Sequence, residues 1–163
     1  MTSSILTTHV GSLPRSKQLS ELLFKKDKGE SFDKNLFDDV VKKNVEQVVN
    51  RQLDVGIDVV SDGEMSKISY ATYVKDRIKG FSGESERRAP ADLDDFPEYK
   101  NKIAKSGGTP TYTRPCCTSD LELQDEESLK NDISNFSNAL SRASHKKGFF
   151  IWSSSIIVNG FYR

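Results

Sequence analysis

The sequence is short of cysteine, of long apolar runs and of net charge of either sign. Its two cysteines, Cys116 and Cys117, are adjacent, and neighbours in sequence rarely pair, so a disulfide framework is not expected. Lysine plus arginine and aspartate plus glutamate number 24 each, which leaves no basic excess for a nucleic acid. No apolar run could cross a bilayer, and residues 1–15 lack the pattern of a secretory signal. These absences favour a cytoplasmic protein with neither a nucleic-acid nor a membrane partner.

The 163 residues suit one ordinary domain, in which apolar segments alternate between two periods. Short β-branched or apolar runs predict strands at Ser4–Val10, Ile57–Val60, Thr109–Thr118 and Gly148–Trp152. Apolar residues three and four apart predict helices at Ser16–Lys26, Asp33–Val55, Ser69–Lys79 and Asp125–Ala143. Gly80–Gly108 is polar and without a period, and we predict a long irregular loop there. The alternation indicates an α/β fold with parallel strands and covering helices.

Two segments that follow predicted strands carry residues suited to chemistry, and in parallel α/β folds function gathers at such loops. In the second segment, Gly63 allows a sharp turn between Asp62 and Glu64. A carboxylate here can hold a substrate ammonium group or act as a general base. The ordinary alternative is that Asp62 caps the next helix and Glu64 is simply exposed. Residue chemistry alone leaves both interpretations open.

The first segment contains Gly11 and Ser12, whose backbone N–H groups can bind a carboxylate or a phosphate. An ordinary turn before a helix explains the same residues and is favoured on the residues alone. His9 is either a base or ligand or, more commonly, a packed and hydrogen-bonded side chain. The cysteine pair does not resemble a zinc site, which takes about four ligands, because adjacent strand residues point to opposite faces. Buried structural cysteine is the better interpretation.

The segments LTTHVGSLPR and QLDVGIDVVSDGEM, taken as a spaced pair, resemble the C-terminal catalytic barrel of cobalamin-independent methionine synthase and its single-barrel relatives. A weaker likeness continues through YATYVKDRIKGF and RPCCTSDLEL to about Gly148. The resemblance implies a (β/α)₈ barrel that transfers a methyl group from a folate to the thiol of homocysteine. In that family a zinc ion holds the thiol as its thiolate, which is the nucleophile.

Carried over by position, the resemblance implies a binding site for an amino-acid thiol in this chain. Val10, Gly11 and Ser12 would hold the substrate carboxylate, and Glu64 would pair with its amino group. His9 and Asp62 would take supporting roles: these six are the substrate-site candidates. No catalytic residue and no metal ligand is assigned.

The sequence also departs from the family. The zinc ligands of relatives, a His-x-Cys motif, a Glu and a further Cys, lie in later strands that the sequence does not contain. Thr111 and Tyr112 stand where folate-dependent members carry Arg-Cys, so folate is an open alternative as methyl donor. A closed barrel takes about 250 residues, with about 200 as a lower limit. We therefore expect residues 1–163 to be one partial domain, the N-terminal half of a (β/α)₈ barrel, with a divergent or truncated end at 151–163.

Four functions are compatible with these patterns. The first is a methyltransferase to the homocysteine thiol, zinc-dependent in the complete family and catalytically incomplete here. The second is an amino-acid-binding module without chemistry, and the third is a fragment without a function of its own. A C-terminal half chain or self-association would then cover its open edges. A decarboxylase of the related uroporphyrinogen type is a distant fourth.

Overall fold

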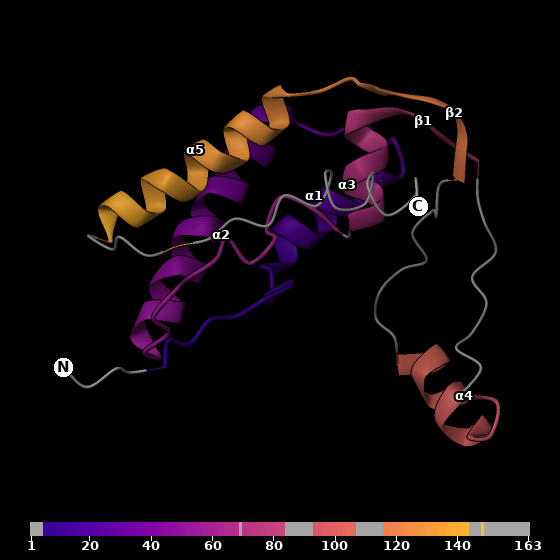
Figure 1. Ribbon diagram of the computed structural model, residues 1–163, viewed down its shortest axis with the longest axis horizontal. Helices are drawn as coiled ribbons and strands as arrows, with labels where there is room; N and C mark the ends of the chain where they lie inside the picture. The colour runs from indigo at the N-terminus through magenta and orange to yellow at the C-terminus, as the bar shows by residue number, and fades with distance from the viewer. Residues whose placement is uncertain (1–4, 69, 84–92, 107–115, 144–147, 149–163) are drawn as a thin grey trace.

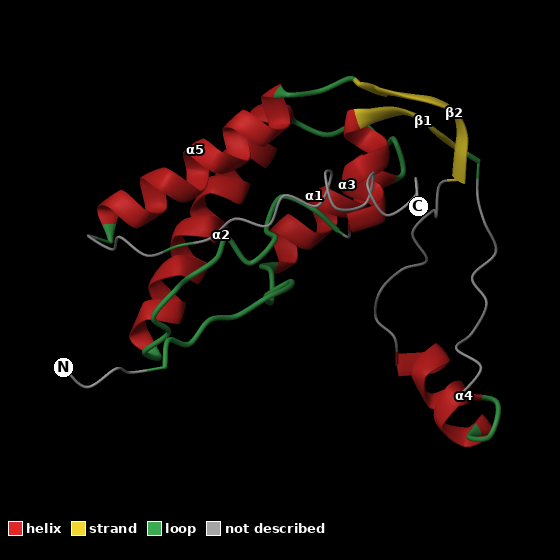
Figure 2. Cartoon of the chain, viewed as in Figure 1, coloured by secondary structure: helices red, strands yellow, loops and turns green. Residues whose placement is uncertain are grey.

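The computed structural model describes residues 5–68, 70–83, 93–106, 116–143 and 148 (Figure 1). Within them lie five helices and two strands: α1 Lys17–Asp27, α2 Lys34–Asp54, α3 Tyr70–Arg77, β1 Ile78–Ser82, α4 Pro97–Ser106, β2 Cys116–Leu123 and α5 Glu127–Arg142 (Figure 2). The predicted positions 4, 69, 109–115 and 149–152 lie outside the described residues. No helix in the described ranges is long and apolar enough to span a membrane.

Helices α1 and α2 confirm the helices predicted at Ser16–Lys26 and Asp33–Val55. Their boundaries were predictable because residues next to each helix start and end set them. The hydroxyl of Ser16 accepts from the N–H of Leu19 at 3.2 Å, and the carboxylate of Asp33 accepts from the N–H of Leu36 at 3.1 Å. Both are side-chain caps of the first helical turn. After α2, Gly56 takes the left-handed conformation, with φ of 83°, that ends many helices.

Most of the predicted third strand, residues 109–115, lies outside the described residues, and the parallel pairing expected for its end, residues 116–118, is wrong. The strand found there, β2, begins at Cys116 and pairs antiparallel with β1, in a register that joins Ile78 to Leu123 and Ser82 to Cys116. A buried parallel strand is a nearly continuous apolar run, whereas residues 120–123 alternate polar and apolar side chains, which is typical of an antiparallel strand. Gly80 is required at the contact, because a Cβ there would lie 2.6 Å from the carbonyl oxygen of Asp120.

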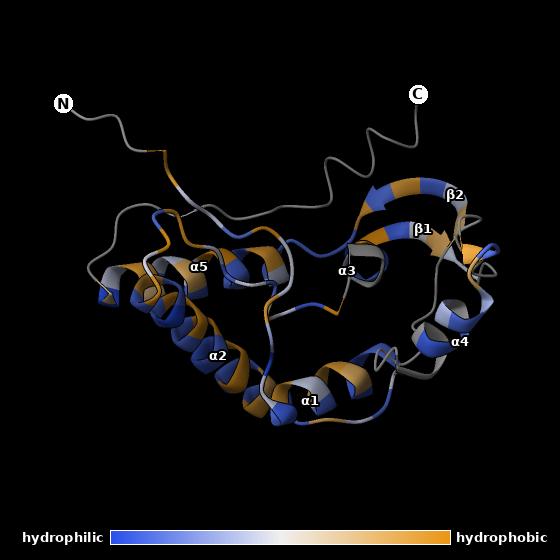
Figure 3. Cartoon of the chain, turned by 90° about the horizontal axis from the view of Figure 1, so that it is seen from below, coloured by the Kyte–Doolittle hydropathy of each residue, from blue (hydrophilic) through white to orange (hydrophobic). Residues whose placement is uncertain are grey.

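The stretch predicted as irregular, residues 80–108, is also more structured than expected. Its first residues belong to β1, and it contains α4. Figures 1 and 3 both show α4 well apart from α2 and α5. On and beside this helix, Phe96 and Tyr99 are exposed. The predicted helix at 69–79 is correspondingly shorter, since its last two residues open β1.

Parallel contacts join the other predicted strands, as single bridges. Thr8 bridges to Val59 and Val60 bridges to Gly148, both in parallel. The N–H of Val59 donates to the carbonyl of Thr7 at 3.0 Å, and the carboxylate of Asp58 accepts from the Thr7 N–H at 2.8 Å. The described residues therefore make an α/β fold with one two-stranded antiparallel sheet, in which three distant segments also touch in parallel.

The apolar core lies between the helices and these segments. In Figures 1 and 3, α5 runs alongside α2, and an ion pair of 3.0 Å joins Arg142 to Glu46 across them. Val60, just before residues 61–67, and Met65, within them, are buried in the same cluster and so attach that segment to the helices. The remaining members of the cluster are Leu19, Leu22, Leu23, Phe37, Val40, Val41, Val45, Val48, Val49, Phe136 and Ala139.

Candidate functional site

The two segments singled out in the sequence meet in the structure. We call residues 9–15 the first loop and residues 61–67 the DGE loop. The hydroxyl of Ser12 donates to Oε2 of Glu64 at 2.5 Å, and the N–H of Leu13 donates to the carbonyl of Gly63 at 3.0 Å. These residues are about fifty positions apart in sequence, so the tertiary fold creates the site.

The DGE loop has an unusual backbone. Gly63 has φ of 62°, and a Cβ there would come within 3.0–3.2 Å of the side chains of Met65, Leu13 and Val48. Glu64 follows with φ of 57°, and no other described residue besides glycine has a positive φ. Such a backbone costs about 1–3 kcal/mol and persists only where its surroundings enforce it. Residues of this kind cluster at functional sites.

The Glu64 side chain is buried, with 4% exposure, which rules out the interpretation that it is simply a surface residue. Its Oε2 accepts from Ser12, but its Oε1 is buried and has no hydrogen-bond partner among the described residues. Buried carboxylate oxygens are normally paired, because leaving one unpaired costs about 1–3 kcal/mol or more. Oε1 is therefore the one polar atom of this carboxylate left to accept a hydrogen bond.

Asp62 lies behind Glu64 and is 3% exposed. Its Oδ1 accepts from the backbone N–H of Glu64 at 3.2 Å, so it braces the turn and does not cap α3, which begins at Tyr70. Burial raises the pKa of Asp62, and the nearby Lys67 ammonium opposes that rise. A supporting role for Asp62 in a substrate site stays a prediction.

The other candidates lie on the first loop. Gly11 has φ of 102°, and the backbone N–H groups of Val10, Gly11 and Ser12 make no hydrogen bond to any described residue. The Val10 side chain is 63% exposed, so this residue can act only through its backbone or at the site entrance. His9 turns into a cleft of about 540 Å³ against α2, and its Nε2 is buried without a partner in the described part of the chain.

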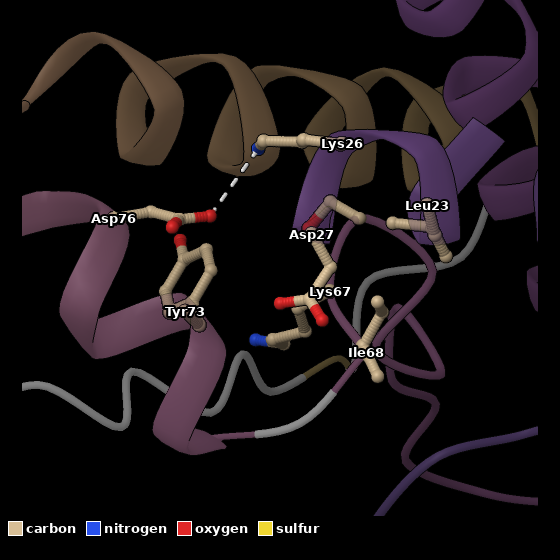
Figure 4. Close-up of a pocket in the computed structure, with 8 residues that line it drawn as sticks. Leu23, Lys26, Asp27, Lys67, Ile68, Tyr73 and Asp76 are labelled. Carbon is tan, nitrogen blue, oxygen red and sulfur yellow. Dashed lines mark ion pairs between the residues drawn. The ribbon is translucent and has the colours of Figure 1, made fainter. Parts of the chain in front are cut away.

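A buried polar cluster beside the DGE loop was missed in the sequence. Lys67 is 2% exposed, and its ammonium lies 4.6 Å from the centre of the Tyr73 ring. The Tyr73 hydroxyl donates to Asp132 at 2.8 Å, and burial raises the pKa of both groups. Figure 4 shows Lys67 and Tyr73 lining one small pocket, near the 4.0 Å ion pair of Lys26 with Asp76. The only signal for Tyr73 in the sequence was its place in the predicted helix at 69–79, and that gives no partner.

The cysteines lie on β2, and neither forms a disulfide. Cys117 is exposed and Cys116 is half-buried, so the prediction of buried structural cysteine is wrong for Cys117. Among the described residues no group of three His, Cys, Asp or Glu is placed to hold a metal ion. The two loops offer carboxylates and one histidine without thiolate, which does not fit the zinc site of the family.

Comparison with known proteins identifies the class. The profile of the family described as the catalytic domain of cobalamin-independent synthase matches residues 5–163. The chain therefore belongs to that family, and its resemblance to cobalamin-independent methionine synthase is confirmed.

Individual relatives of known name support the same family. The chain is 31% identical over 75 residues to the 5-methyltetrahydropteroyltriglutamate–homocysteine methyltransferase of Bifidobacterium longum, an alignment that covers 46% of this chain and 10% of that protein. The enzyme of the same name from Bifidobacterium animalis is 29% identical over an equal span, again 46% of this chain and 10% of that protein. A B12-independent methionine synthase from Shewanella, solved in complex with selenomethionine, has a similar fold, with a TM-score of 0.53 and 16% identity over 88% of this chain. The chain spans 36% of that structure.

Proposed function

We propose that the first loop and the DGE loop bind the amino-acid end of a thiol substrate such as homocysteine. The observation that carries this proposal is the unpartnered Oε1 of the buried Glu64. A substrate ammonium group carries three N–H donors and a positive charge, and so it supplies both what this oxygen lacks and the counter-charge of the carboxylate.

The first loop suits the other end of the same molecule. Its backbone N–H groups from Val10 to Ser12 have no partner in the described residues, and such groups bind carboxylates. Ser12 links the two halves, since its hydroxyl contacts Glu64. A zwitterionic α-amino acid therefore meets donors on one side and an acceptor on the other. Relatives named for the methylation of homocysteine support this choice of amino acid.

The proposed role of this chain in methyl transfer is to hold the acceptor. In the family, zinc activates the thiol when it is bound, but the described residues do not fit a zinc site, and no step through zinc follows from them. We infer that the chain alone binds the amino acid without turnover, with the thiol-activating groups and the methyl donor, including folate, supplied from elsewhere. A complementing chain or self-association could supply them.

The proposed fold also goes beyond the contacts observed among the described residues. We infer that segments 5–10, 57–60 and the one beginning at Gly148 are neighbouring parallel strands of a partial (β/α)₈ barrel. Two parallel bridges in the right order and the likeness to the Shewanella synthase support it. The antiparallel pair of β1 and β2 would then be an insertion between the second barrel strand and α5.

Calorimetric titration with L-homocysteine and L-methionine tests the binding proposal. Glu64→Gln keeps the shape and the Ser12 contact but removes the charge, and we expect affinity to fall about 10- to 100-fold, the value of one charged hydrogen bond. Glu122→Gln is the matched control, because that glutamate is exposed on β2, and it should bind like the wild type. Wild-type protein that binds neither ligand would refute the proposal. Stoichiometric zinc in the isolated chain would refute the inference that the thiol-activating groups are supplied from elsewhere.

A further inference from the structure

Arg15, at the end of the first loop, reaches across to the DGE loop. A single nitrogen of its guanidinium, Nη2, donates to the carbonyl oxygen of Glu64 at 2.9 Å and to that of Lys67 at 2.6 Å. These two carbonyls are the first and last of the turn that contains Glu64. The N–H of Lys67 also donates to the Glu64 carbonyl, at 3.3 Å, so Arg15 adds to the backbone hydrogen bond that joins the two ends of this turn.

The backbone beside Arg15 is anchored firmly enough to hold that turn. The N–H of Ser16 donates to the amide oxygen of Asn44 at 3.1 Å, and Asn44 is itself buried on α2, where its nitrogen donates to the carbonyl of Val40. Arg15 is half-buried between these anchored residues and the DGE loop. The arginine thus joins the strained turn to the longest helix of the chain.

The charge of the Arg15 guanidinium also suits its place beside the DGE loop. Burial disfavours the charged form of Arg15 and lowers its pKa, while Glu64 and Asp62 both favour the charged form. The guanidinium therefore lies within electrostatic reach of both carboxylates. Its Nη2 nevertheless bonds to backbone carbonyls, while its Nε and Oε1 of Glu64 are both buried without a partner among the described residues. Arg15 stabilises the loop without occupying the acceptor that a ligand needs.

We propose that Arg15 is a positioning residue, which holds the left-handed turn at Glu64 so that Oε1 faces the amino group of the ligand. This inference rests on the proposed amino-acid site, but its first consequence does not require a ligand. Without the arginine, the turn should open more often and the carboxylate should lose its single orientation.

The experiment compares Arg15→Met and Arg15→Lys with wild type. Methionine keeps much of the apolar stem and removes the donors. Lysine returns one cationic nitrogen, and because one nitrogen makes both native bonds, it should restore part of the effect. Lys17→Met is the matched control, since Lys17 is an almost fully exposed cation two residues away. Far-UV circular dichroism and thermal unfolding establish that each variant is folded.

The first measurement is amide hydrogen exchange. In Arg15→Met, exchange at the amides of residues 63–67 should be at least about tenfold faster, the equivalent of one charged hydrogen bond, with α2 unchanged. The exchange rates of Arg15→Lys should lie between those of Arg15→Met and the wild type, and the rates of Lys17→Met should match the wild type. Unchanged exchange over residues 63–67 in Arg15→Met would overturn the inference.

The second measurement separates positioning from general loosening. Titrations with L-methionine and with its deaminated analogue, 4-(methylsulfanyl)butanoate, report the preference for the amino group. Arg15→Met should lose about tenfold of that preference while its affinity for the analogue is unchanged, and Arg15→Lys should recover part of it. An equal loss for both ligands, or a full preference in Arg15→Met, would contradict positioning. If the wild type has no preference, the proposed function fails, and the exchange data alone decide whether Arg15 holds the turn.

Discussion

Replacement of Gly63 by alanine tests the packing of the DGE loop against the helices. The backbone φ of 62° costs an L-residue about 1 kcal/mol. The added methyl group would also lie 3.0 Å from Met65 Cε, 3.1 Å from Leu13 Cβ and 3.2 Å from Val48 Cγ2, closer than ordinary contact. Met65 can move its flexible end, but Leu13 is held by its hydrogen bond to the Gly63 carbonyl. Overpacking of this kind adds about 1–2 kcal/mol, for a total of about 2–3 kcal/mol.

Gly56→Ala is the control that isolates the packing contribution. Gly56 has φ of 83° and no heavy atom within 4 Å of the position of an added Cβ, so alanine there meets only the backbone cost of about 1 kcal/mol. The reduced freedom of the unfolded chain is the same in both variants and cancels. Urea unfolding of the two variants should differ by about 1–2 kcal/mol, with Gly63→Ala the less stable. Equal stabilities would refute the close packing of the first loop on the DGE loop.

Three further predictions concern other parts of the chain. Burial raises the pKa of Asp132 above 3.8, so this carboxyl binds a proton more readily in the folded protein than in the unfolded chain. Its contribution to stability is therefore greatest at acid pH and falls as pH rises through the raised pKa. In urea unfolding, Asp132→Asn should lose less stability than the wild type from about pH 4 upward, and parallel stability–pH curves would contradict this. Asp125 accepts hydrogen bonds from the first turn of α5, including the hydroxyl of Ser128, so Asp125→Ala should cost about 0.5–2 kcal/mol in the same assay, whereas no loss would show that the cap is unimportant. A thiol-specific reagent should modify the exposed Cys117 faster than the half-buried Cys116, as peptide mass spectrometry can measure; the reverse order would contradict the β2 register.

Local structure could be predicted from the sequence wherever its causes are local. The period of α2 and the caps at Ser16 and Asp33 involve residues within one or two turns of each other, so the pattern already contains the interactions that form the helix. The two loops that carry the candidate site were also recognised, because strand ends followed by glycine and polar residues indicate such places whatever their partners are.

Pairing between distant segments was not predictable in the same way. A strand pattern gives no partner, so the predicted strand ending at Thr118 was expected in a parallel sheet, whereas residues 116–123 form an antiparallel pair with β1. The burial of Lys67 with Tyr73 and Asp132 likewise requires α3 and α5 to come together, and no spacing in the sequence expresses that distance.

The sequence by itself determined helices α1, α2 and α5, the family and the two loops, since each depends on residues that are close together in the chain or on short sequence motifs. Only the tertiary structure decided what those loops do to each other. It brought Ser12, Leu13 and Arg15 against a turn some fifty residues away, and it buried Glu64 with one oxygen bonded and the other without a partner among the described residues. The physical reason is that burial and hydrogen-bond satisfaction are properties of packing, and packing joins residues that the chain keeps far apart.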